Sequence, residues 1–455
     1  MMKVTKPVKK KISGWGNYPV ESCFVYRPEN ETDIHDIIEG TQDFSHIAYG
    51  LGRSYADTAL NKDQGVIRLE QLNHFLHFDE DQRLLTCEAG VTLSDIIDVF
   101  LPRGYFLPVT PGTKLVTVGG AIANDVHGKN HHVDGCFSEF VTSFDLLTGS
   151  GEVMTCSREE NSEVFWATVG GIGLTGIILR ATISLIPVES AFINVTYEKA
   201  GHLDEAFDKF IENDQNYKYS VAWIDCLSSG SSLGRSVLMR GDHAKQSDLP
   251  MNVQDPYALP NKFPLKMPVH APGMALNYWS ISAFNQLYYS SFKDESKLED
   301  LTSFFHPLDA IDDWNKLYGR NGFVQYQAVF PKDQQPKEGI RKLLERLSSD
   351  KRSSFLAVLK SSGQANHGML SFPMEGYTLA LDIPNKKGLF PFLKELDEIV
   401  LAHGGRVYLA KDASLDEETF KQMYPRWEEF LNVKQQVDPK GVFRSSMSRR
   451  LGLTD

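Results

Sequence analysis

Three glycine-rich stretches could bring the backbone close to a ligand that carries phosphate. They are residues 48–57 (AYGLGRSYAD), residues 111–130 and residues 170–176. In the first stretch Gly50 and Gly52 expose backbone N–H groups and Ser54 adds a hydroxyl, which suits a pyrophosphate. Glycine also permits close approach of the backbone to a ligand. Together the stretches predict a site for one long dinucleotide lying across a small domain.

Residues 171–176 (GIGLTG) match the GxGxxG fingerprint of Rossmann domains. In a Rossmann domain this fingerprint opens a helix, and an acidic residue follows about 20 positions later. Here residues 177–186 (IILRATISLI) are rich in β-branched residues and predict a strand. We therefore expect the glycines to serve a different nucleotide-binding fold.

Two glutamines define a polar face on a strand expected over residues 323–330 (FVQYQAVF). Gln325 and Gln327 share one side of that strand because side chains alternate along it. On a face that should be apolar they are costly unless they are hydrogen-bonded. The strand is either a surface strand or the floor of a pocket that binds sugar hydroxyls.

His127 lies at the polar end of the second glycine-rich stretch, close to His131 and His132. Three histidines raise the question of a metal, but no carboxylate or cysteine completes a ligand set, so we expect no metal. An ordinary structural histidine and a contact with the ligand are the other two interpretations.

Several segments, in their order, resemble the FAD domain of the vanillyl-alcohol oxidase superfamily and, within it, the decaprenylphosphoryl-β-D-ribose 2-oxidase family. Gly50, Gly52 and Ser54 match the pyrophosphate loop of the superfamily. The segments that narrow the resemblance to the family are GGAIANDVHGKNHH (119–132), FWATVGGIGLTGII (165–178), YSVAWID (219–225), GFVQYQ (322–327), LSFP (370–373), RVYLAKD (406–412) and VDPKGVFRSSMSRRL (437–451). The resemblance covers essentially the whole chain.

The resemblance implies FAD held without a covalent bond. Tyr55 stands where many relatives place the histidine that links to the flavin, and Lys114 stands where bicovalent relatives place a cysteine. A phenol lacks the imidazole that forms the usual linkage. The residues that the resemblance places at the cofactor are Gly50, Gly52, Arg53, Ser54, Tyr55, Gly112, Thr117, Val118, Gly119, Gly120, His127, Gly128, Asn130, Ile177 and Tyr408.

The resemblance also implies a reaction. The family oxidises the 2′-hydroxyl of a polyprenyl-phosphoryl-β-D-ribofuranose to the 2′-keto sugar, the first half of an epimerisation that supplies arabinose for the cell wall. Oxygen or a quinone would take the electrons, and a nicotinamide-dependent short-chain reductase would complete the epimerisation. The implied catalytic residues are His127, Lys411, Gln325 and Gln327, with either His127 or Lys411 as the base; the implied substrate contacts are Tyr55, Trp223, Gln325, Gln327, Lys360, Thr378, Ala380 and Lys411.

One strand departs from the family pattern. Ala380 stands where mycobacterial members carry a reactive cysteine, and Thr378 replaces an asparagine. The exact substrate therefore stays open, and the alternative is a soluble polyol or aldonolactone oxidase on the same scaffold. Tyr55 weighs against that alternative because those enzymes usually hold FAD covalently. A flavin-binding protein without catalysis would need neither the paired glutamines nor Lys411.

The elements that position these residues predict an α+β protein of two domains, since 455 residues exceed what one core usually serves. The expected fold is the two-domain FAD-binding PCMH-type (vanillyl-alcohol oxidase-like) fold, with an α+β substrate domain built on an antiparallel sheet. The expected FAD-binding domain covers residues 1–190 and includes a capping box at Thr92 and Asp95. The substrate-binding domain covers 191–404, with a helix expected over 298–305 and a long proline-rich loop over 240–275. Residues 405–455 are expected to complete the FAD domain and the active site.

Composition excludes several classes. A net charge of −12 argues against nucleic acid as the main partner. The basic start of the chain is not followed by an apolar core and cleavage site, so we expect no secretory signal, and five cysteines without a CxxC pair predict a reducing, cytoplasmic location. The lysines at 3, 6, 9, 10 and 11 are either a frayed, solvated tail or a weak peripheral contact with anionic lipid.

Overall fold

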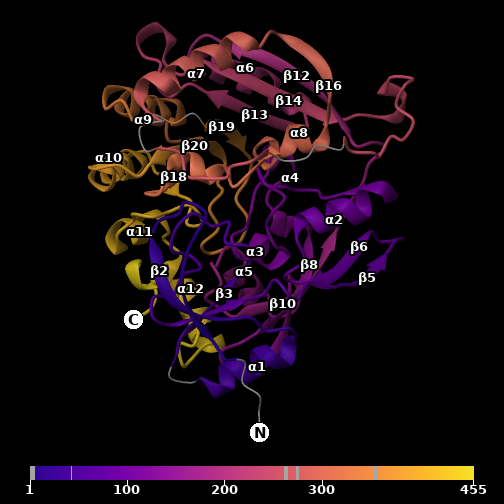
Figure 1. Cartoon of the computed structure of the whole chain (residues 1–455), viewed down its shortest axis with the longest axis vertical. Coiled ribbons are helices and arrows are strands. Elements are labelled where there is room, and N and C mark those ends of the chain that lie inside the picture. Colours follow the sequence, from indigo (N-terminus) through magenta and orange to yellow (C-terminus); the bar gives the residue numbers. More distant parts are fainter. Residues whose placement is uncertain (1–5, 42–43, 261–264, 273–275, 353, 355) are drawn as a thin grey trace.

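The computed structural model describes residues 6–41, 44–260, 265–272, 276–352, 354 and 356–455. Figure 1 shows two sheet-containing halves stacked along the longest axis, with the N-terminal residues in the lower half. The fold is the expected α+β, two-domain PCMH-type fold, which confirms the predicted fold class.

The lower half contains a mixed sheet and an antiparallel sheet; the first glycine-rich stretch continues from β3 of the mixed sheet, and the third directly precedes β10 of the antiparallel sheet. The mixed sheet has the order β1 (Val8–Ser13), β2 (Val20–Tyr26), β4 (Gly65–Arg68) and β3 (His46–Tyr49). The antiparallel sheet has the order β5 (Phe75–Asp79), β6 (Leu84–Glu88), β10 (Ile177–Ser184), β8 (Val141–Leu147) and β9 (Val153–Ser157), while β7 (Tyr105–Phe106) pairs with β11 (Ile186–Pro187). Because β10 directly follows the GxGxxG match as a strand, the expectation of no Rossmann helix there is confirmed.

Short helices connect these strands and carry the predicted caps. They are α1 (Glu31–Gly40), α2 (Leu93–Phe100), α3 (Val118–Ala123), α4 (His131–Asp134) and α5 (Ser162–Thr168). The capping box of α2 forms as predicted: the Thr92 hydroxyl accepts from the Asp95 N–H, and the Asp95 carboxylate accepts from the Thr92 N–H. Caps of this kind set where a helix begins. In α2 the cap starts the helix at Leu93, and four residues separate it from the end of β6 at Glu88.

The upper half is built on an antiparallel sheet that, among the described residues, has eight strands. Their order is β16 (Glu295–Asp300), β12 (Phe192–Ala200), β14 (Ser236–His243), β13 (Tyr219–Ile224), β19 (Ala357–Ser362), β20 (Gly376–Pro384), β18 (Phe323–Pro331) and β21 (Arg406–Val407). Helices α6 (Leu203–Asn213), α9 (Pro336–Ser349) and α10 (Leu389–Ala402) pack against one of its faces. In α9 the buried residues Ile340, Leu343, Leu344 and Leu347 follow the i, i+3, i+4, i+7 spacing of such a helix. The opposite face of the sheet is left to face the lower half.

The C-terminal segment returns to the lower half (yellow in Figure 1). Its helices are α11 (Glu417–Met423), α12 (Trp427–Val437) and α13 (Ser446–Arg450). The buried Lys434 ammonium donates to Asp438 and to the carbonyls of Leu174 and Phe443, so one side chain ties α12 to the third glycine-rich stretch. We propose domain boundaries near residues 190 and 404; the chain enters the eight-stranded sheet with β12 and leaves it after β21 ends at Val407.

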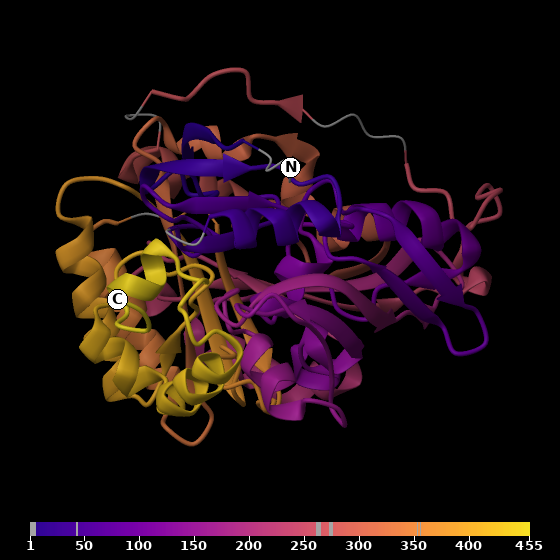
Figure 2. The same cartoon turned by 90° about the horizontal axis from the view of Figure 1, so that it is seen from below.

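Three local expectations need correction. The strand β14 runs to His243, so the loop predicted over 240–275 begins after it; Arg240 lies at a buried ladder position, where strand pairing overrides the nearby prolines. Residues 298–300 are the end of β16, and only Leu301–Phe305 (α8) is helical, because Asp300 caps that helix. Within the expected loop, β15 (Leu265–Lys266) pairs with β17 (Ile311–Asp312); Pro264 lies outside the described residues. Figure 2 shows this stretch running along the outside of the molecule.

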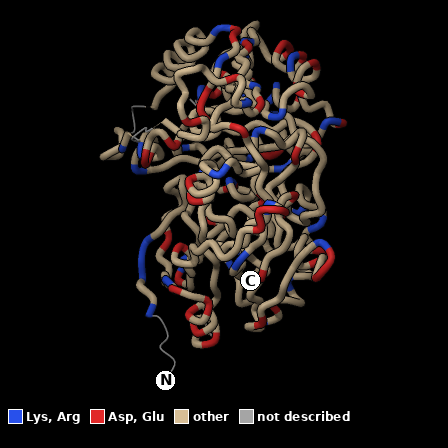
Figure 3. Tube along the Cα trace, turned by 90° about the vertical axis from the view of Figure 1, so that its right-hand side faces the viewer, with Lys and Arg blue, Asp and Glu red and all other residues tan. Residues whose placement is uncertain are grey.

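The lysine-rich start is not a frayed tail over residues 9–11. Lys9, Lys10 and Lys11 belong to β1, which pairs with β2, and Lys9 forms an exposed ion pair with Asp63 at 3.0 Å. Figure 3 shows this lysine run next to the N-terminus. Lys3 lies outside the described residues. Strand pairing holds these side chains on the mixed sheet, and an exposed pair of this kind contributes little to stability.

Candidate functional site

A cavity of about 570 Å³ lies between the two halves of the molecule. Its wall includes residues of all three glycine-rich stretches and side chains from the free face of the eight-stranded sheet. Strand alternation explains the second group, because every other residue of β13, β14, β18, β19 and β20 points to that face. The residues of these five strands on the wall are Val221, Trp223, Met239, Gln325, Gln327, Val358, Lys360 and Ala380, and Tyr197, Lys297 and Glu299 join them from β12 and β16.

Most of the residues expected at cofactor and substrate line this cavity. They are Gly50, Gly52, Arg53, Ser54, Tyr55, Gly112, Thr117, Gly119, Gly120, His127, Gly128, Tyr408, Trp223, Gln325, Gln327, Lys360, Ala380 and Lys411. Lys114, whose position mattered only for a covalent link, contacts Asp98 at 3.8 Å.

Four expected residues do not line the cavity. Val118 is a buried core residue at the start of α3, and Ile177 pairs with Leu147 in β10, with Ile178 on the cavity wall instead. The Asn130 amide donates to the Pro108 carbonyl at 2.8 Å and so fixes the loop. Thr378 is fully buried and pairs with Lys360 across the ladder. Family position therefore selected segments that line the cavity, but it did not predict which residues of each segment line it.

The loop after β3 keeps its backbone donors available. Among the described residues, the N–H groups of Leu51, Gly52, Arg53 and Ser54 have no backbone carbonyl partner, whereas the Tyr55 N–H donates to the Ala410 carbonyl at 2.9 Å. Gly52 has φ +66°, and an added Cβ would meet the Tyr49 hydroxyl oxygen at 2.0 Å. Consecutive free N–H groups form a concavity that suits an anion such as a pyrophosphate.

Three buried polar atoms on the wall have no hydrogen-bond partner among the described residues: Arg53 Nε, Asn124 Oδ1 and His127 Nδ1. Buried polar groups are nearly always hydrogen-bonded, so these atoms indicate a polar ligand. Together with the free N–H groups they fit a dinucleotide such as FAD. Tyr55 offers no imidazole for a covalent link, in agreement with non-covalent binding.

The polar floor of the cavity is one hydrogen-bonded chain. The Lys411 ammonium donates to Gln325 Oε1, and the Gln325 amide donates to Asp382 Oδ1 at 2.5 Å. Lys411 Nζ also lies 4.3 Å from the centroid of the Tyr55 ring. Burial lowers the pKa of Lys411 and raises that of Asp382, because each charge is removed from water. The two groups share this chain, so their charges offset each other.

His127 is held by the second glutamine. Its Nε2 lies 2.9 Å from Gln327 Nε2, and its ring packs 5.3 Å from that of Tyr408. Burial, reinforced by the nearby Lys360, lowers the pKa of His127 well below its usual range, so its imidazole is neutral at pH 7. The neighbouring histidines have other partners: His131 Nδ1 accepts from the Gly363 N–H, and His132 Nε2 contacts the Tyr217 carbonyl. This separation of partners argues against the metal interpretation.

Two further cavity residues were not anticipated. Lys129 donates to the Phe304 carbonyl and lies 4.1 Å from the Phe304 ring, and burial lowers its pKa to about 7. Asn124 is the second and also lines the cavity. The anticipated Lys360 lines the same cavity, and burial lowers its pKa to about 8. Both Lys129 and Asn124 fall inside the polar end of the 111–130 stretch, so a closer interpretation of that stretch could have found them.

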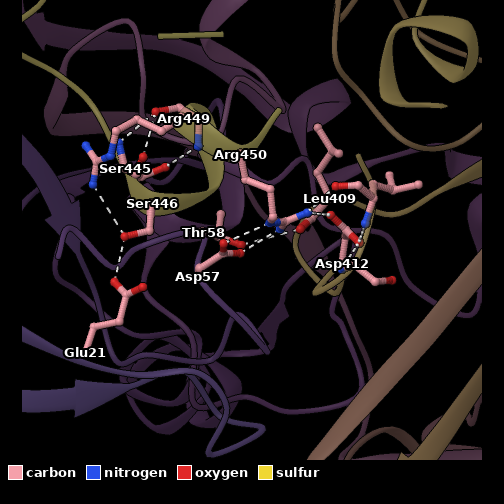
Figure 4. Close-up of polar contacts among 12 residues, drawn as sticks. Glu21, Asp57, Thr58, Leu409, Asp412, Ser445, Ser446, Arg449 and Arg450 are labelled. Atoms are coloured by element: carbon pink, nitrogen blue, oxygen red, sulfur yellow. Dashed lines mark hydrogen bonds and ion pairs between the residues drawn. The ribbon is translucent and has the colours of Figure 1, made fainter. Parts of the chain in front are cut away.

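The C-terminal helix α13 holds the floor against the glycine loop (Figure 4). The Arg450 guanidinium donates to both carboxylate oxygens of Asp57 at 3.0 and 2.7 Å, and to Asp412 Oδ2 at 2.9 Å. Asp57 follows Tyr55 by two residues, and Asp412 follows Lys411 directly. We call Asp57, Asp412 and Arg450 the arginine clamp. It fixes the spacing between Tyr55 and Lys411.

Comparisons with known proteins agree with this geometry. Residues 23–157 match the family model described as FAD binding domain, and residues 383–451 match that described as D-arabinono-1,4-lactone oxidase. The chain is 41% identical over 98% of its length to decaprenylphosphoryl-β-D-ribose oxidase of Mycolicibacterium smegmatis, of which 98% is covered. It is 33% identical over 80% of its length to an uncharacterised protein of Streptomyces coelicolor, covered completely, and 24% identical to L-gulonolactone oxidase of Scyliorhinus torazame, with 94% of each chain covered.

The glycine loop, the polar floor and the full-length similarity to a curated oxidase agree with one another. The expected cofactor and enzyme class are confirmed. The chain belongs to the decaprenylphosphoryl-β-D-ribose oxidase family and is an FAD-dependent oxidoreductase that acts on a CH–OH group.

Proposed function

We propose that this enzyme oxidises the 2′-hydroxyl of a polyprenyl-phosphoryl-β-D-ribofuranose to the 2′-keto sugar. The proposal rests on one observation: the glycine loop, Gln325, Gln327 and Lys411 line the same cavity. Amide and amine groups that share one side of a cavity can hold several hydroxyls of one sugar. The M. smegmatis relative, named for a decaprenylphosphoryl ribose substrate, supports the same substrate class.

Lys411 is the base in this proposal. Because burial lowers its pKa, part of its population is neutral near pH 7 and can accept the hydroxyl proton. Asp382, joined to Lys411 through Gln325, then offsets the charge of the ammonium that forms. Bound FAD supplies the acceptor for the hydride that leaves the same carbon. Proton and hydride together account for the two electrons and two hydrogens lost by the alcohol.

His127 orients the substrate rather than taking its proton. Its Nε2 is engaged by Gln327, and its Nδ1 faces no described partner. A neutral imidazole at this place can exchange one hydrogen bond with a sugar hydroxyl or the cofactor. Lys129 and Lys360 lie on the cavity wall, where a bound substrate phosphate would favour their charged forms and be held by them.

The wider context follows from the same substrate class. Oxygen or a quinone would take the electrons from the reduced cofactor, and a nicotinamide-dependent short-chain reductase would convert the ketone to the arabinose epimer. All five cysteines lie in the described residues and are free and buried, which suits the cytoplasmic location that we propose. No described helix is long and apolar enough to cross a membrane. We also propose that the enzyme contacts the membrane peripherally.

The test is anaerobic bleaching of the flavin by a panel of substrates. Prenyl-phosphoryl ribofuranoses should reduce the flavin, while free polyols and aldonolactones should not do so at equal concentration. Reduction by an aldonolactone alone would favour the alternative, a soluble lactone oxidase. Residues 383–451 match a family model described as D-arabinono-1,4-lactone oxidase, so this alternative is included in the test. The ketone should be found at C2′, and oxidation at another carbon would contradict the proposal.

A further inference from the structure

Helix α7 (Tyr278–Ser291) carries no charged residue in its 14 positions. Trp279 is 78% exposed and Leu287 is 72% exposed, and Phe284 between them is 43% exposed. At 100° per residue these three side chains fall within one arc of about 140° on the helix surface. A surface helix normally covers its outer face with charged groups. The outer face of α7 is instead uncharged: the same arc holds Trp279, Phe284 and Leu287 together with the exposed serines at 280, 290 and 291.

The inner face of the same helix reaches the cavity. Tyr288 lines the cavity wall and packs against Trp223 with ring centroids 4.8 Å apart, and Phe292 directly after the helix also lines the wall. Val221 and Met239 lie on the same wall. One helix therefore connects an apolar part of the cavity with an apolar part of the outer surface.

Cations surround α7 at both ends. At its start, Lys386 donates to the Leu276 carbonyl at 2.7 Å and Lys351 lies 5.4 Å from the Tyr278 ring centroid. Near its end, Lys199 and Arg235 lie 4.1 and 5.0 Å from the Tyr289 ring centroid. An apolar face between cations is the pattern of a surface that binds the headgroup region of an anionic bilayer.

We propose that the outer face of α7 docks on an anionic lipid bilayer and so places the cavity next to the bilayer. This inference rests on the proposed function, because a polyprenyl-phosphoryl sugar keeps its apolar chain in the membrane. The apolar chain then passes along α7 while the sugar reaches Gln325, Gln327 and Lys411. The bilayer is the occupant we propose because Lys351 and Lys386 flank the start of the exposed face, although Asp294 lies beside Lys199 at its other end.

Flotation with vesicles tests the docking without substrate. The FAD-loaded enzyme should float with vesicles rich in phosphatidylglycerol and float less with pure phosphatidylcholine. The double variant Trp279→Ser, Leu287→Ser should bind at least ~10-fold more weakly, since two exposed apolar side chains lose their burial in lipid. The matched control is Ile211→Ser on α6, which removes an equally exposed apolar residue (68% exposed) elsewhere and should leave binding unchanged.

Three results would overturn the docking surface. They are absence of wild-type binding to both kinds of vesicle, equal binding by the double variant, and self-association of the wild type that the double variant abolishes. Charge reversal gives an independent check, because Lys351→Glu with Lys386→Glu should weaken binding to anionic vesicles several-fold but leave the weak binding to phosphatidylcholine unchanged. Equal loss on both vesicle types would show that these lysines only support the fold.

Catalysis separates the docking from the proposed function. With a soluble short-chain prenyl-phosphoryl ribose, the double variant should reduce its flavin as fast as the wild type. With the long-chain substrate embedded in vesicles, it should show a raised KM and an unchanged kcat. Vesicle binding without flavin reduction by either substrate would refute the proposed substrate and leave the docking surface standing. An unchanged KM on vesicles would refute delivery along α7.

Discussion

The Lys411 ammonium lies over the face of the Tyr55 ring, 4.3 Å from its centroid, although the two residues are separated by more than 350 positions. The contact joins the glycine loop to the segment that follows β21. A cation over an aromatic face is attracted by the ring's negative centre. The ring thus holds the lysine at the floor of the cavity, while Gln325 accepts its hydrogen bond.

Lys411→Ala should retain FAD but lose substrate-driven flavin reduction by at least ~10²-fold, a typical loss for one electrostatic stabiliser or base. Stopped-flow bleaching measures the rate, and the flavin spectrum measures the bound cofactor. In the wild type, kcat/KM should rise with pH through the lowered pKa of Lys411, because only the neutral amine accepts a proton. Lys342→Ala, an exposed lysine on α9, is the control. A colourless Lys411→Ala protein would instead assign the lysine to cofactor binding.

Acid precipitation should release all of the yellow colour into the supernatant. The reason is Tyr55, which occupies the position of the linking histidine and whose ring packs edge-on against Phe323 at 5.5 Å. Absorbance of supernatant and pellet near the flavin maximum measures the release. Flavin that stays with the precipitated protein would refute non-covalent binding.

The arginine clamp predicts a positioning effect. Arg450→Met removes the donors shared by Asp57 and Asp412, so we expect kcat to fall about 10-fold or more while KM changes little, because the spacing of Tyr55 and Lys411 loosens. Arg450→Lys should recover part of the rate, as it keeps the charge but loses the fork. The readout specific to positioning is the flavin absorption spectrum with FAD bound. An equal loss of kcat in Arg449→Met, which removes the neighbouring arginine bonded to Asn61, would indicate a general effect on α13.

Sequence reasoning found the glycine stretches and both glutamines because glycine spacing and strand alternation are local properties. The position of Gln325 depends on distant residues: its partner Asp382 comes from β20 and its partner Lys411 from the segment after β21, and only the fold brings them together. The same holds for Arg450, whose tail motif gave no sign that it bonds Asp57 across more than 390 positions. Side-chain direction was the least predictable feature. Ile177 was expected at the cofactor, but its neighbour Ile178 lines the cavity instead.

Helix ends were predicted correctly where nearby residues form a cap. They were missed where strand pairing determines the structure. Thr92 and Asp95 carry the information for the start of α2 in four residues. A helix was expected over residues 298–305, but residues 298–300 pair with β12. An edge strand gains ladder hydrogen bonds that the sequence pattern does not reveal. Arg240 lies in a strand because β14 pairs with β12 on one side and with β13 on the other.

Buried neutral histidines should make the fold sensitive to mild acid. Burial lowers the pKa of His46 to about 4 and that of His306 to about 3, from an ordinary value of 6.5. Between those values the unfolded chain binds more protons than the folded chain, so stability is full above about pH 6.5 and is lost as the pH falls. Tm measured between pH 7.5 and 5 should therefore decrease.

His306→Gln isolates one such group. The glutamine can still hydrogen-bond to Thr110 but does not titrate, so the variant should lose about 2 kcal/mol less stability than the wild type on going from pH 7.5 to 5. Denaturant unfolding at both pH values measures the difference. His77→Gln, at an exposed position, serves as the control and should follow the wild type. Parallel curves for the wild type and His306→Gln would contradict a buried neutral His306.

The last prediction concerns Ala380, which lies on the cavity wall and pairs with Gln327 across the ladder. All five native cysteines are buried, and burial raises the pKa of Cys87 and Cys226 to about 12, so few thiolates form at neutral pH. A nitroaromatic compound that the flavin reduces, of the kind that traps the cysteine of mycobacterial relatives, should therefore add no mass to the wild type. Ala380→Cys should gain one adduct after turnover, while Val153→Cys, at an exposed position on β9, should gain none. Intact mass and peptide mapping decide between the outcomes. An adduct on residues 376–384 of the wild type, or none on Ala380→Cys despite flavin turnover, would show that this strand does not face the reacting part of the flavin.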